Sequence, residues 1–396
     1  MIQKEVPLKL NAVRRNRIVN TSRIIREIWT ARSISRVDLS RKLDLNKSTV
    51  TNIIGGLLES KLVLETTEGP STPQGGRKPA RLEINRNYGY ILGLEIRPES
   101  YTVVAVDILG DILFSRTESI QINADNFKTV FFKIQSELEI ELSWIGRPLI
   151  GIGMGVSGII DAPNRIIKAS IPLNFTEPFD LYREIALQSK VPVYVDNDAN
   201  SCAWGELTFH RTQNLKNFLF CLIEFRDFTK SSQQTAIGMG IALNGKVYYG
   251  RNCSAGEFRS LYCNTEDNAG QISLDYARDI PIIEEPEIIE RFIRELSQHL
   301  ALFVNTFNLS QVFLGGDLGP HMTERFRTIL NEEISRNWPY QEQVDCEVRF
   351  STLGDKSVAY GAAGLVMNRI FIDLEVLDAE DIHRFGSLEL VGNDAL

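Results

Sequence analysis

Apolar residues recur at roughly helical spacing in the first part of the chain. The segment 14–30 carries isoleucines at this spacing with basic residues between them, which predicts an amphipathic helix. A second, shorter helix is predicted after it, because Ser33 or Ser35 can cap its start and Asp38 lies in its first turn. The polar run 44–46 then makes a turn. Two short helices joined in this way are typical of a helix-turn-helix.

A third helix is predicted from residue 47 onward, with an apolar stripe on one side. Short polar donors at the start of the second helix of such a pair can reach base edges and phosphates in a major groove of DNA. The side chains near the start and on the exposed face of this helix are therefore candidate DNA contacts. They are Lys47, Ser48, Thr49, Thr51 and Asn52.

Two strand-like runs, 62–66 and 80–84, flank a stretch rich in glycine, proline, serine and threonine. This pattern predicts a two-stranded wing. Arg77 and Lys78 follow two glycines at the end of the tip, where the backbone can approach a groove and the cations can face phosphate. The sequence thus predicts a winged helix-turn-helix DNA-binding domain over residues 1–84. A protein-interaction or dimerisation module is the alternative for the three helices.

Charge is distributed unevenly and favours the DNA interpretation. Residues 1–80 hold 15 Lys+Arg and 7 Asp+Glu, whereas the remaining residues hold 28 and 44. A basic module joined to an acidic body is expected of a nucleic-acid reader with a separate effector domain. A solvated basic tail would not interleave its cations with a regular apolar pattern.

From residue 90 onward, short apolar strand-like runs alternate with helical patterns, which predicts an α/β domain in two lobes. A helix is expected over residues 180–189. We assign the effector domain to residues 85–396. Its first lobe comprises about 85–197 plus a C-terminal helix from about 358, and its second lobe about 198–357.

No run approaches the roughly 18 apolar residues of a membrane span, and the N-terminus has no apolar signal region. The five cysteines form no Cys-x-x-Cys pair, which suits a reducing compartment better than a disulfide framework. We therefore expect a cytoplasmic protein.

Ordered motifs along nearly the whole chain resemble the ROK family of bacterial repressors and sugar kinases. Besides Gly-Arg-Lys-Pro in the wing, they are GMGVSGIID (153–161), PVYVDNDAN (192–200), AIGMGIALNG (236–245), Ala255-Gly256-Glu257, Gly315-Gly316 and Tyr360-Gly361-Ala362-Ala363. The resemblance implies an actin-like fold with a ligand cleft between its lobes. It also implies that Asp198 corresponds to the general base of the family's kinases.

The phosphate loop of those kinases is altered in this chain. The family pattern Asp-x-Gly-Gly-Thr-Lys is replaced by Glu95, Ile96, Arg97, Pro98, Glu99 and Ser100. Pro98 removes an N–H donor, Arg97 adds bulk, and Glu99 places negative charge where phosphate would bind. Ala236 replaces a glycine in the second phosphate loop. We therefore expect no kinase activity and no nucleotide cofactor.

The family's zinc ligands are also largely absent. The resemblance implies one histidine and three cysteines after Ala-Gly-Glu, where this chain has Ser260, Cys263, Thr265 and Gln271. One thiolate cannot hold zinc in a closed tetrahedral site. No structural metal is expected.

The resemblance implies that Asn174, Asn197, Asp198 and Glu257 contact the hydroxyl groups of a sugar. For Asn197 the alternative is structural, because an asparagine at a strand-to-helix turn can simply bond the backbone. The sequence identifies neither the sugar nor its phosphorylation state.

These observations predict a transcriptional regulator, a repressor of carbohydrate genes, that responds to a sugar bound in a degenerate kinase-like cleft. Its partners would be a double-stranded DNA operator and a sugar effector, and a homodimer or homotetramer would match a palindromic site. The alternatives are an ATP-dependent sugar kinase with an appended DNA-binding module and a DNA-binding protein with a ligandless body.

Overall fold

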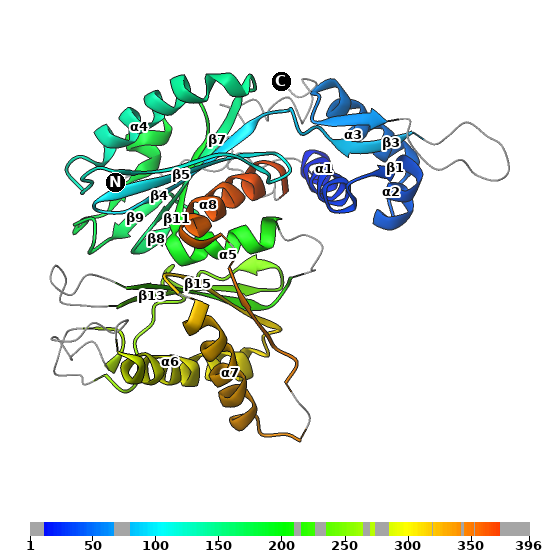
Figure 1. Ribbon diagram of the computed structural model, residues 1–396. Coiled ribbons are helices and arrows are strands. Elements are labelled where there is room, and N and C mark those ends of the chain that lie inside the picture. The colour runs from blue at the N-terminus through cyan, green and yellow to red at the C-terminus, as the bar shows by residue number, and fades with distance from the viewer. Residues whose placement is uncertain are drawn as a thin grey trace.

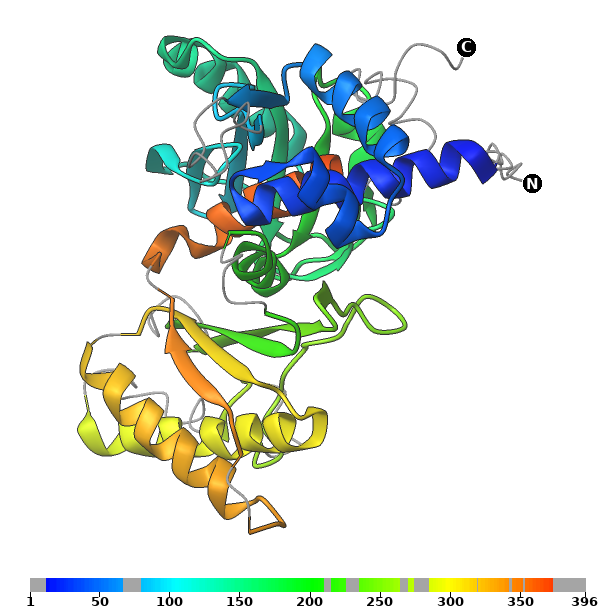
Figure 2. The same ribbon diagram turned by 90° about the vertical axis from the view of Figure 1, so that its right-hand side faces the viewer.

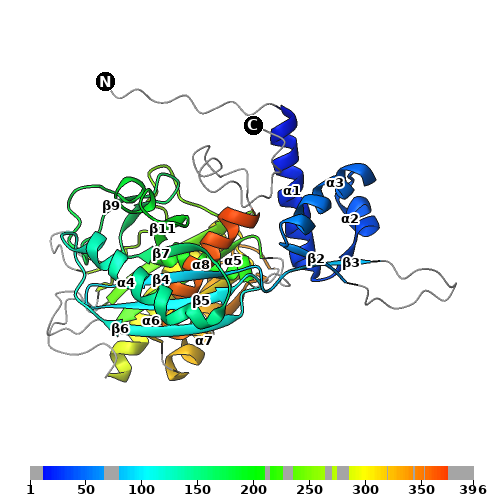
Figure 3. The same cartoon turned by 90° about the horizontal axis from the view of Figure 1, so that it is seen from above.

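The computed structural model describes residues 12–66, 80–209, 215–225, 235–263, 270–273, 285–318, 320–341, 344–351 and 353–372. A small N-terminal module is followed by two lobes that stack on each other, with two helices between them (Figure 1). The N-terminal module lies beside the first lobe (Figure 3).

The N-terminal module consists of three helices and a small sheet. The helices are α1 (Ala12–Ala31), α2 (Arg36–Leu43) and α3 (Lys47–Glu59). The strands β1 (Ile34–Ser35), β2 (Val63–Thr66) and β3 (Arg81–Ile84) form an antiparallel sheet in the order β1-β3-β2. The wing strands β2 and β3 are present as predicted, while Arg77 and Lys78 lie outside the described residues.

Local sequence sets the corner between α2 and α3. The Ser35 side chain caps α2 by accepting a hydrogen bond from the Asp38 N–H at 3.2 Å. Asp44 ends α2 in the left-handed conformation, with φ of 53°, and α3 starts three residues later. Apolar side chains of all three helices, including Ile28, Leu39 and Ile54, are fully buried in one core.

The first lobe is built on a five-stranded sheet in the order β11-β7-β4-β5-β6. Its strands are β4 (Tyr90–Ile96), β5 (Ser100–Asp107), β6 (Ile112–Ser119), β7 (Leu149–Val156) and β11 (Val193–Asn197). Helix α4 (Phe127–Glu141) covers one face and α8 (Ser357–Met367) the other (Figure 1). A short 3-10 helix, η1 (Leu142–Ile145), follows α4.

A three-stranded sheet extends the first lobe toward the cleft. It comprises β8 (Ile159–Asp161), β9 (Ile166–Ala169) and β10 (Phe179–Asp180). The helix predicted over residues 180–189 is much shorter in the structure, and its first residue, Asp180, pairs with β9 instead. Only the π-helical turn η2 (Tyr182–Ala186) forms there.

The second lobe has a sheet of order β14-β13-β12-β15-β16, with two helices on its outer face (Figure 2). Its strands are β12 (Phe218–Phe225), β13 (Thr235–Leu243), β14 (Lys246–Val247), β15 (Gln311–Gly316) and β16 (Glu347–Phe350). The outer helices are α6 (Pro286–Phe307) and α7 (Pro320–Arg336). The inner face packs on α5 (Asp198–Phe209).

Helices α5 and α8 pack against each other between the two sheets, and glycines permit their close approach. A Cβ added at Gly93 of β4 would lie 1.8 Å from the Ala359 carbonyl of α8, and one at Gly361 of α8 would lie 1.9 Å from the Ser201 carbonyl of α5. No side chain fits at these positions, so α8 is held directly on the first-lobe sheet and α5 directly on α8.

The N-terminal module and the segment that follows it contact the first lobe. Helix α1 contacts η6 (Asn368–Ile372), the π-helical turn that continues α8. Between β3 and β4, Arg86 forms ion pairs with Asp107 at 3.3 Å and Asp111 at 2.6 Å in the first lobe. A 3-10 turn, η5 (Gly354–Lys356), precedes α8.

The α/β fold class, with a winged helix-turn-helix followed by a two-lobed actin-like domain, is confirmed. The boundary between residues 84 and 85 stays a prediction, as do the limits of the two lobes. No helix in the described part of the chain is long and apolar enough to cross a membrane.

Candidate functional site

The cleft between the lobes contains two adjoining compartments. The first, which we call the Glu257 compartment, has a volume of about 380 Å³. The second, the Arg97 compartment, has a volume of about 490 Å³. Both are lined by Ser157, Pro172, Asp198 and Glu224, so one ligand can reach from either compartment into the other.

Asp198 lies where the two compartments meet. It is the first residue of α5 and directly follows β11, so the chain reversal places its carboxylate at a helix N-terminus. The Ser157 side chain hydrogen-bonds to it, and its Oδ1 also accepts the Ala199 N–H at 2.7 Å. Burial between the lobes raises its pKa above the usual range for an aspartate. This carboxylate can accept a ligand hydroxyl.

The side chain of Asn197 forms its hydrogen bonds with the surrounding backbone. Its side-chain Oδ1 accepts the N–H groups of Ala199 at 2.9 Å and Asn200 at 3.3 Å, and its Nδ2 donates to the Gly158 carbonyl at 3.0 Å. Asn197 lines the Glu257 compartment, but these bonds match the structural alternative that the sequence left open. Its main effect is to fix the turn that presents Asp198.

Behind Asp198, the fully buried Asp196 holds the strand-to-helix corner. Its Oδ2 accepts hydrogen bonds from the Tyr249 hydroxyl at 2.6 Å and the Trp204 indole at 3.0 Å. Tyr249 follows β14 of the second lobe, so this contact joins the two lobes. Burial raises the pKa of Asp196, and the hydrogen bonds oppose that rise.

Glu257 faces Asp198 from the second lobe. It follows Gly256, whose φ of 91° and whose contact with β13 exclude a side chain, since a Cβ there would lie 1.8 Å from the Met239 carbonyl. Glu257 itself forms an isolated bridge to Gly238 of β13. Desolvation raises the pKa of its carboxyl group, and Glu257 adds to the rise in the pKa of Asp198. The structure thus brings Asp198 and Glu257 together.

Asn174, the remaining predicted sugar contact, is placed differently. It is an exposed residue of the turn after Pro172, with φ of 59°, and it is not among the residues that line either compartment. Its role as a ligand residue stays a prediction without support from this geometry.

Arg97 occupies the position where the resemblance places a phosphate-binding glycine. Its Nε donates to Oε1 of Glu95 on β4 at 2.7 Å, and its Nη2 lies 2.7 Å from Oε1 of Glu224 on β12. Burial raises the pKa of Glu95 to about 7, although Arg97 opposes this shift. The Arg97 guanidinium therefore connects the two lobes beside the position of Asp198.

The backbone of this loop offers few donors to an anion. The Arg97 N–H bonds to the Ser100 carbonyl at 2.9 Å, and Pro98 has no N–H. Glu99 and Asp317 add carboxylates to the same compartment. These residues do not fit a nucleotide triphosphate, whose binding needs converging amides and cations.

Hydrogen bonds hold the region in which the family resemblance places the zinc ligands. The Gln271 side chain accepts from the Ile237 N–H at 2.7 Å and donates to the carbonyls of Ile237 and Phe258, both at 2.8 Å. Ser260 accepts from the Tyr262 N–H at 3.1 Å, and Cys263 lies nearby, whereas Thr265 is outside the described residues. Gln271 thus links β13 to the Glu257 loop and is not free to bind a metal.

The predicted DNA-contacting residues share one side of α3. Lys47, Ser48, Thr51 and Asn52 are exposed and Thr49 is half-buried, whereas Val50, Ile53, Ile54 and Leu57 are buried in the module. The Thr51 hydroxyl donates to the Lys47 carbonyl at 2.8 Å, which orients it along the helix. The exposed side of α3 is therefore polar and basic at its start.

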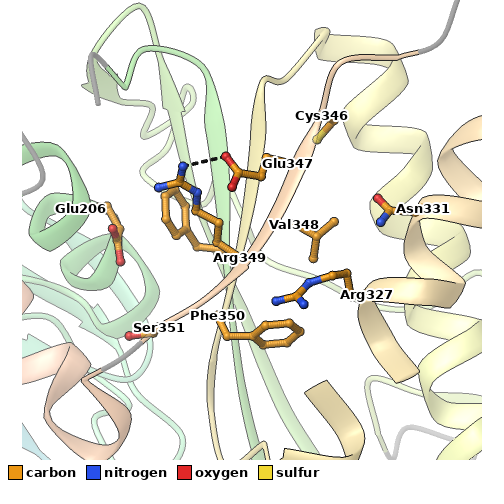
Figure 4. A pocket seen from close by; sticks show the side chains of 10 residues that line it. Glu206, Arg327, Asn331, Cys346, Glu347, Val348, Arg349, Phe350 and Ser351 are labelled. Atoms are coloured by element: carbon orange, nitrogen blue, oxygen red, sulfur yellow. Dashed lines mark ion pairs between the residues drawn. The ribbon is translucent and has the colours of Figure 1, made fainter. Parts of the chain in front are cut away.

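A third cavity, of about 720 Å³, lies away from these residues, between the end of α5 and the edge strand β16 (Figure 4). Arg349 pairs with Glu347 at 2.7 Å on its wall, and Arg327 pairs with Glu324 at 2.8 Å. Because these arginines already form ion pairs with glutamates of the protein, this cavity is a weaker candidate for a ligand site than the cleft.

Comparison with known proteins identifies the same family as the motifs. The ROK family model matches residues 137–271, and the chain therefore contains a ROK family domain. It is 32% identical over 239 residues to the xylose repressor of Staphylococcus xylosus, covering 60% of this chain and 59% of that protein. It is 26% identical to the xylose repressor of Bacillus spizizenii, over 90% of this chain and 96% of that one.

A solved structure of a ROK family transcriptional regulator, a homologue of the Escherichia coli Mlc protein, has the same fold over both parts of the chain. The TM-score is 0.71 at 20% identity, with 95% of this chain and 99% of the other covered.

Two side chains of the candidate site escaped the sequence reasoning. Glu224 and Tyr249 belong to the second lobe and bind Arg97 and Asp196 of the first lobe, so no spacing along the chain signals them. The motif around Asp198 identified the position of the site, but not the residues that close it from the opposite side.

Proposed function

We propose that this protein is a DNA-binding transcriptional repressor whose operator affinity is controlled by a sugar in the Glu257 compartment. One observation carries the proposal: a cleft that contains two carboxylates, Asp198 and Glu257, shares a chain with a helix-turn-helix, and the Arg97–Glu224 ion pair lies beside these carboxylates. A sugar pocket without a phosphate donor site serves recognition and not transfer.

The relatives named xylose repressors make xylose, or a similar free aldose, the first sugar to test. The carboxylates of the Glu257 compartment support an uncharged ligand, because a phosphate group there would meet Asp198, Glu224 and Glu257. Hydroxyl groups, in contrast, donate well to carboxylates.

DNA binding belongs in this proposal to α3 and the wing. The polar start of α3 would enter a major groove, and the basic charge of the module would supply the electrostatic part of the affinity. A homodimer or homotetramer on a palindromic operator is the assembly that we propose.

Hydrogen bonds, one electrostatic interaction and helix packing together support communication between the cleft and the DNA module. Asp196, next to the Asn197–Asp198 corner, is bonded to Tyr249, and Arg369 lies close enough to offset part of the rise in pKa that burial imposes on Tyr249. Arg369 belongs to η6, on which α1 packs. We propose that a sugar at Asp198 shifts this network and thereby the position of α1.

The kinase alternative rests on Asp198 alone. A general base needs a phosphoryl donor, and the Arg97 compartment presents four carboxylates besides Asp198, from Glu95, Glu99, Glu224 and Asp317, against one guanidinium. Mg²⁺-bound ATP would have to displace the Arg97 ion pairs and would find few backbone donors.

The proposal is tested with full-length protein and fluorescent DNA carrying the upstream region of its own operon. Anisotropy titration should show tight binding that weakens when xylose, or another free aldose of a panel, is added. A coupled assay for ADP should show no turnover with the same sugars. Turnover, or operator affinity that no sugar changes, would contradict the proposal.

A further inference from the structure

The Arg97 compartment is larger than the Glu257 compartment and opens directly from it. Their junction is framed by Ser157 from the first lobe, by Asp198 at the start of α5 and by Glu224 from the second lobe. A ligand whose hydroxyl binds Asp198 therefore presents its neighbouring atoms to the Arg97 compartment. In a phosphotransferase this space would hold the donor, and in this chain its lining has changed.

The lining is rich in hydrogen-bond acceptors and poor in donors. Glu99 and Asp317 are exposed to the compartment, Glu224 closes its far side, and Arg97 is the one cation among its described lining residues. Apolar surface from Pro98 and Phe225 completes the walls. Carboxylates beside apolar patches match the hydroxyl groups and C–H faces of a sugar ring, and they repel phosphate.

Glu95 adds an acceptor whose capacity is not used. Its side chain is 3% exposed, and Arg97 satisfies Oε1, but Oε2 has no hydrogen-bond partner among the described residues. A buried carboxylate oxygen without a donor is unfavourable, and a ligand often supplies the missing donor. A hydroxyl group that entered beside Arg97 would do so.

We propose that the Arg97 compartment binds a second, uncharged glycosyl unit, so that the effector site accepts a disaccharide or glycoside whose first ring lies in the Glu257 compartment. This inference rests on the proposed function, because it extends the same effector site. It assigns the space of the former phosphate donor to the remainder of a larger sugar.

Calorimetric titration of the full-length protein tests this inference with xylose, its 1,4-linked dimer xylobiose and xylose 1-phosphate as probes. Xylobiose should bind at least about tenfold more tightly than xylose, since one hydrogen bond to a charged acceptor accounts for such a factor. Xylose 1-phosphate should bind more weakly than xylose.

Matched variants separate the two compartments. Glu99→Gln, at an exposed residue that lines only the Arg97 compartment, should reduce the ratio of xylobiose affinity to xylose affinity. Glu257→Gln, at a residue that lines only the other compartment, should weaken both sugars and preserve the ratio.

Equal or weaker binding of xylobiose, while xylose still alters operator affinity, would overturn this inference and leave the proposed function intact. Tighter binding of the phosphate would also overturn it. A third outcome is that neither xylobiose nor any sugar of the aldose panel binds the protein or changes its operator affinity. Both this inference and the proposed function would then be wrong.

Discussion

Arg97 and Glu224 form an ion pair across the cleft, with Nη2 and Oε1 2.7 Å apart, and the two residues belong to different lobes. The same guanidinium also bonds Glu95 of the first lobe at 2.7 Å. The Arg97 side chain therefore joins the two lobes directly, beside the Arg97 compartment.

Glu95 should make stability depend on pH. Its pKa of about 7 in the folded protein exceeds the ordinary value of 4.5, so the folded state binds more protons between these limits. The free energy of unfolding should therefore fall as pH rises through this window, by roughly 2–4 kcal/mol from this group.

The variant Glu95→Gln cannot ionise and should lose this part of the pH dependence. Urea denaturation at about pH 5 and about pH 8 measures the free energy of unfolding of both proteins. Relative to the wild type, the variant should be more stable at the higher pH than at the lower pH. If the free energy of unfolding changed with pH in the same way in both proteins, ionisation of Glu95 would not destabilise the fold, and this prediction would be wrong.

Tyr249→Phe should weaken communication between the sugar and the operator. The substitution removes the hydroxyl that donates to Asp196 at 2.6 Å and keeps the ring. Sugar affinity and operator affinity, each measured alone, should change by less than about threefold, but the effect of sugar on operator affinity should shrink by about 1 kcal/mol or more.

Phe303→Leu is a suitable control, because Phe303 lies on α6 and packs, half-buried, against the core of the second lobe, away from this network. Its coupling should equal that of the wild type. An unchanged coupling in Tyr249→Phe would remove the hydroxyl from the proposed route.

Asp198→Asn should weaken the effector and spare DNA binding. The amide keeps the shape of the side chain but no longer provides charge-assisted acceptance, at a cost of roughly 1.5–3 kcal/mol. Sugar affinity should then fall by about ten- to a hundredfold, as isothermal calorimetry can measure. Operator affinity without sugar should stay the same. Loss of DNA binding together with early melting would make Asp198 a structural residue.

DNA contacts of two kinds should respond differently to substitution. Lys47→Ala, at the exposed start of α3, should change sequence preference as well as affinity. Replacing Arg77 and Lys78 with alanine should weaken binding and lower its salt dependence, because fewer counterions are released. Mobility-shift titrations at two salt concentrations compare them, and unchanged affinity in the Arg77/Lys78 variant would exclude the wing from the interface.

The local elements were predictable because their signals are local. The cap at Ser35, the turn at residues 44–46 and the buried face of α3 follow from neighbouring residues. The helix over residues 180–189 was wrong as a full helix: strand pairing with β9 overrides the helical pattern at Asp180, and only the turn Tyr182–Ala186 is helical. Local propensity is decisive only where tertiary pairing does not compete with it.

The site was predictable from one side only. The corner at Asp198 lies within one short motif, and the loss of the phosphate loop at Arg97 and Pro98 was visible in the sequence. The partners that complete the cleft, Glu224 and Tyr249, come from distant segments, and their pairing depends on how the lobes stack. The network of Gln271, which holds the region of the absent zinc ligands, depends on the same stacking.

The central claim is that one chain couples a sugar site to an operator site, and reciprocal linkage tests it most directly. Operator affinity is measured with and without saturating sugar, and sugar affinity is measured for free and operator-bound protein. Thermodynamic linkage requires the factor by which sugar weakens operator binding to equal, per binding site, the factor by which the operator weakens sugar binding. Our account predicts that each factor is at least about five. Ratios of one in both directions, with sugar and operator each bound, would contradict it.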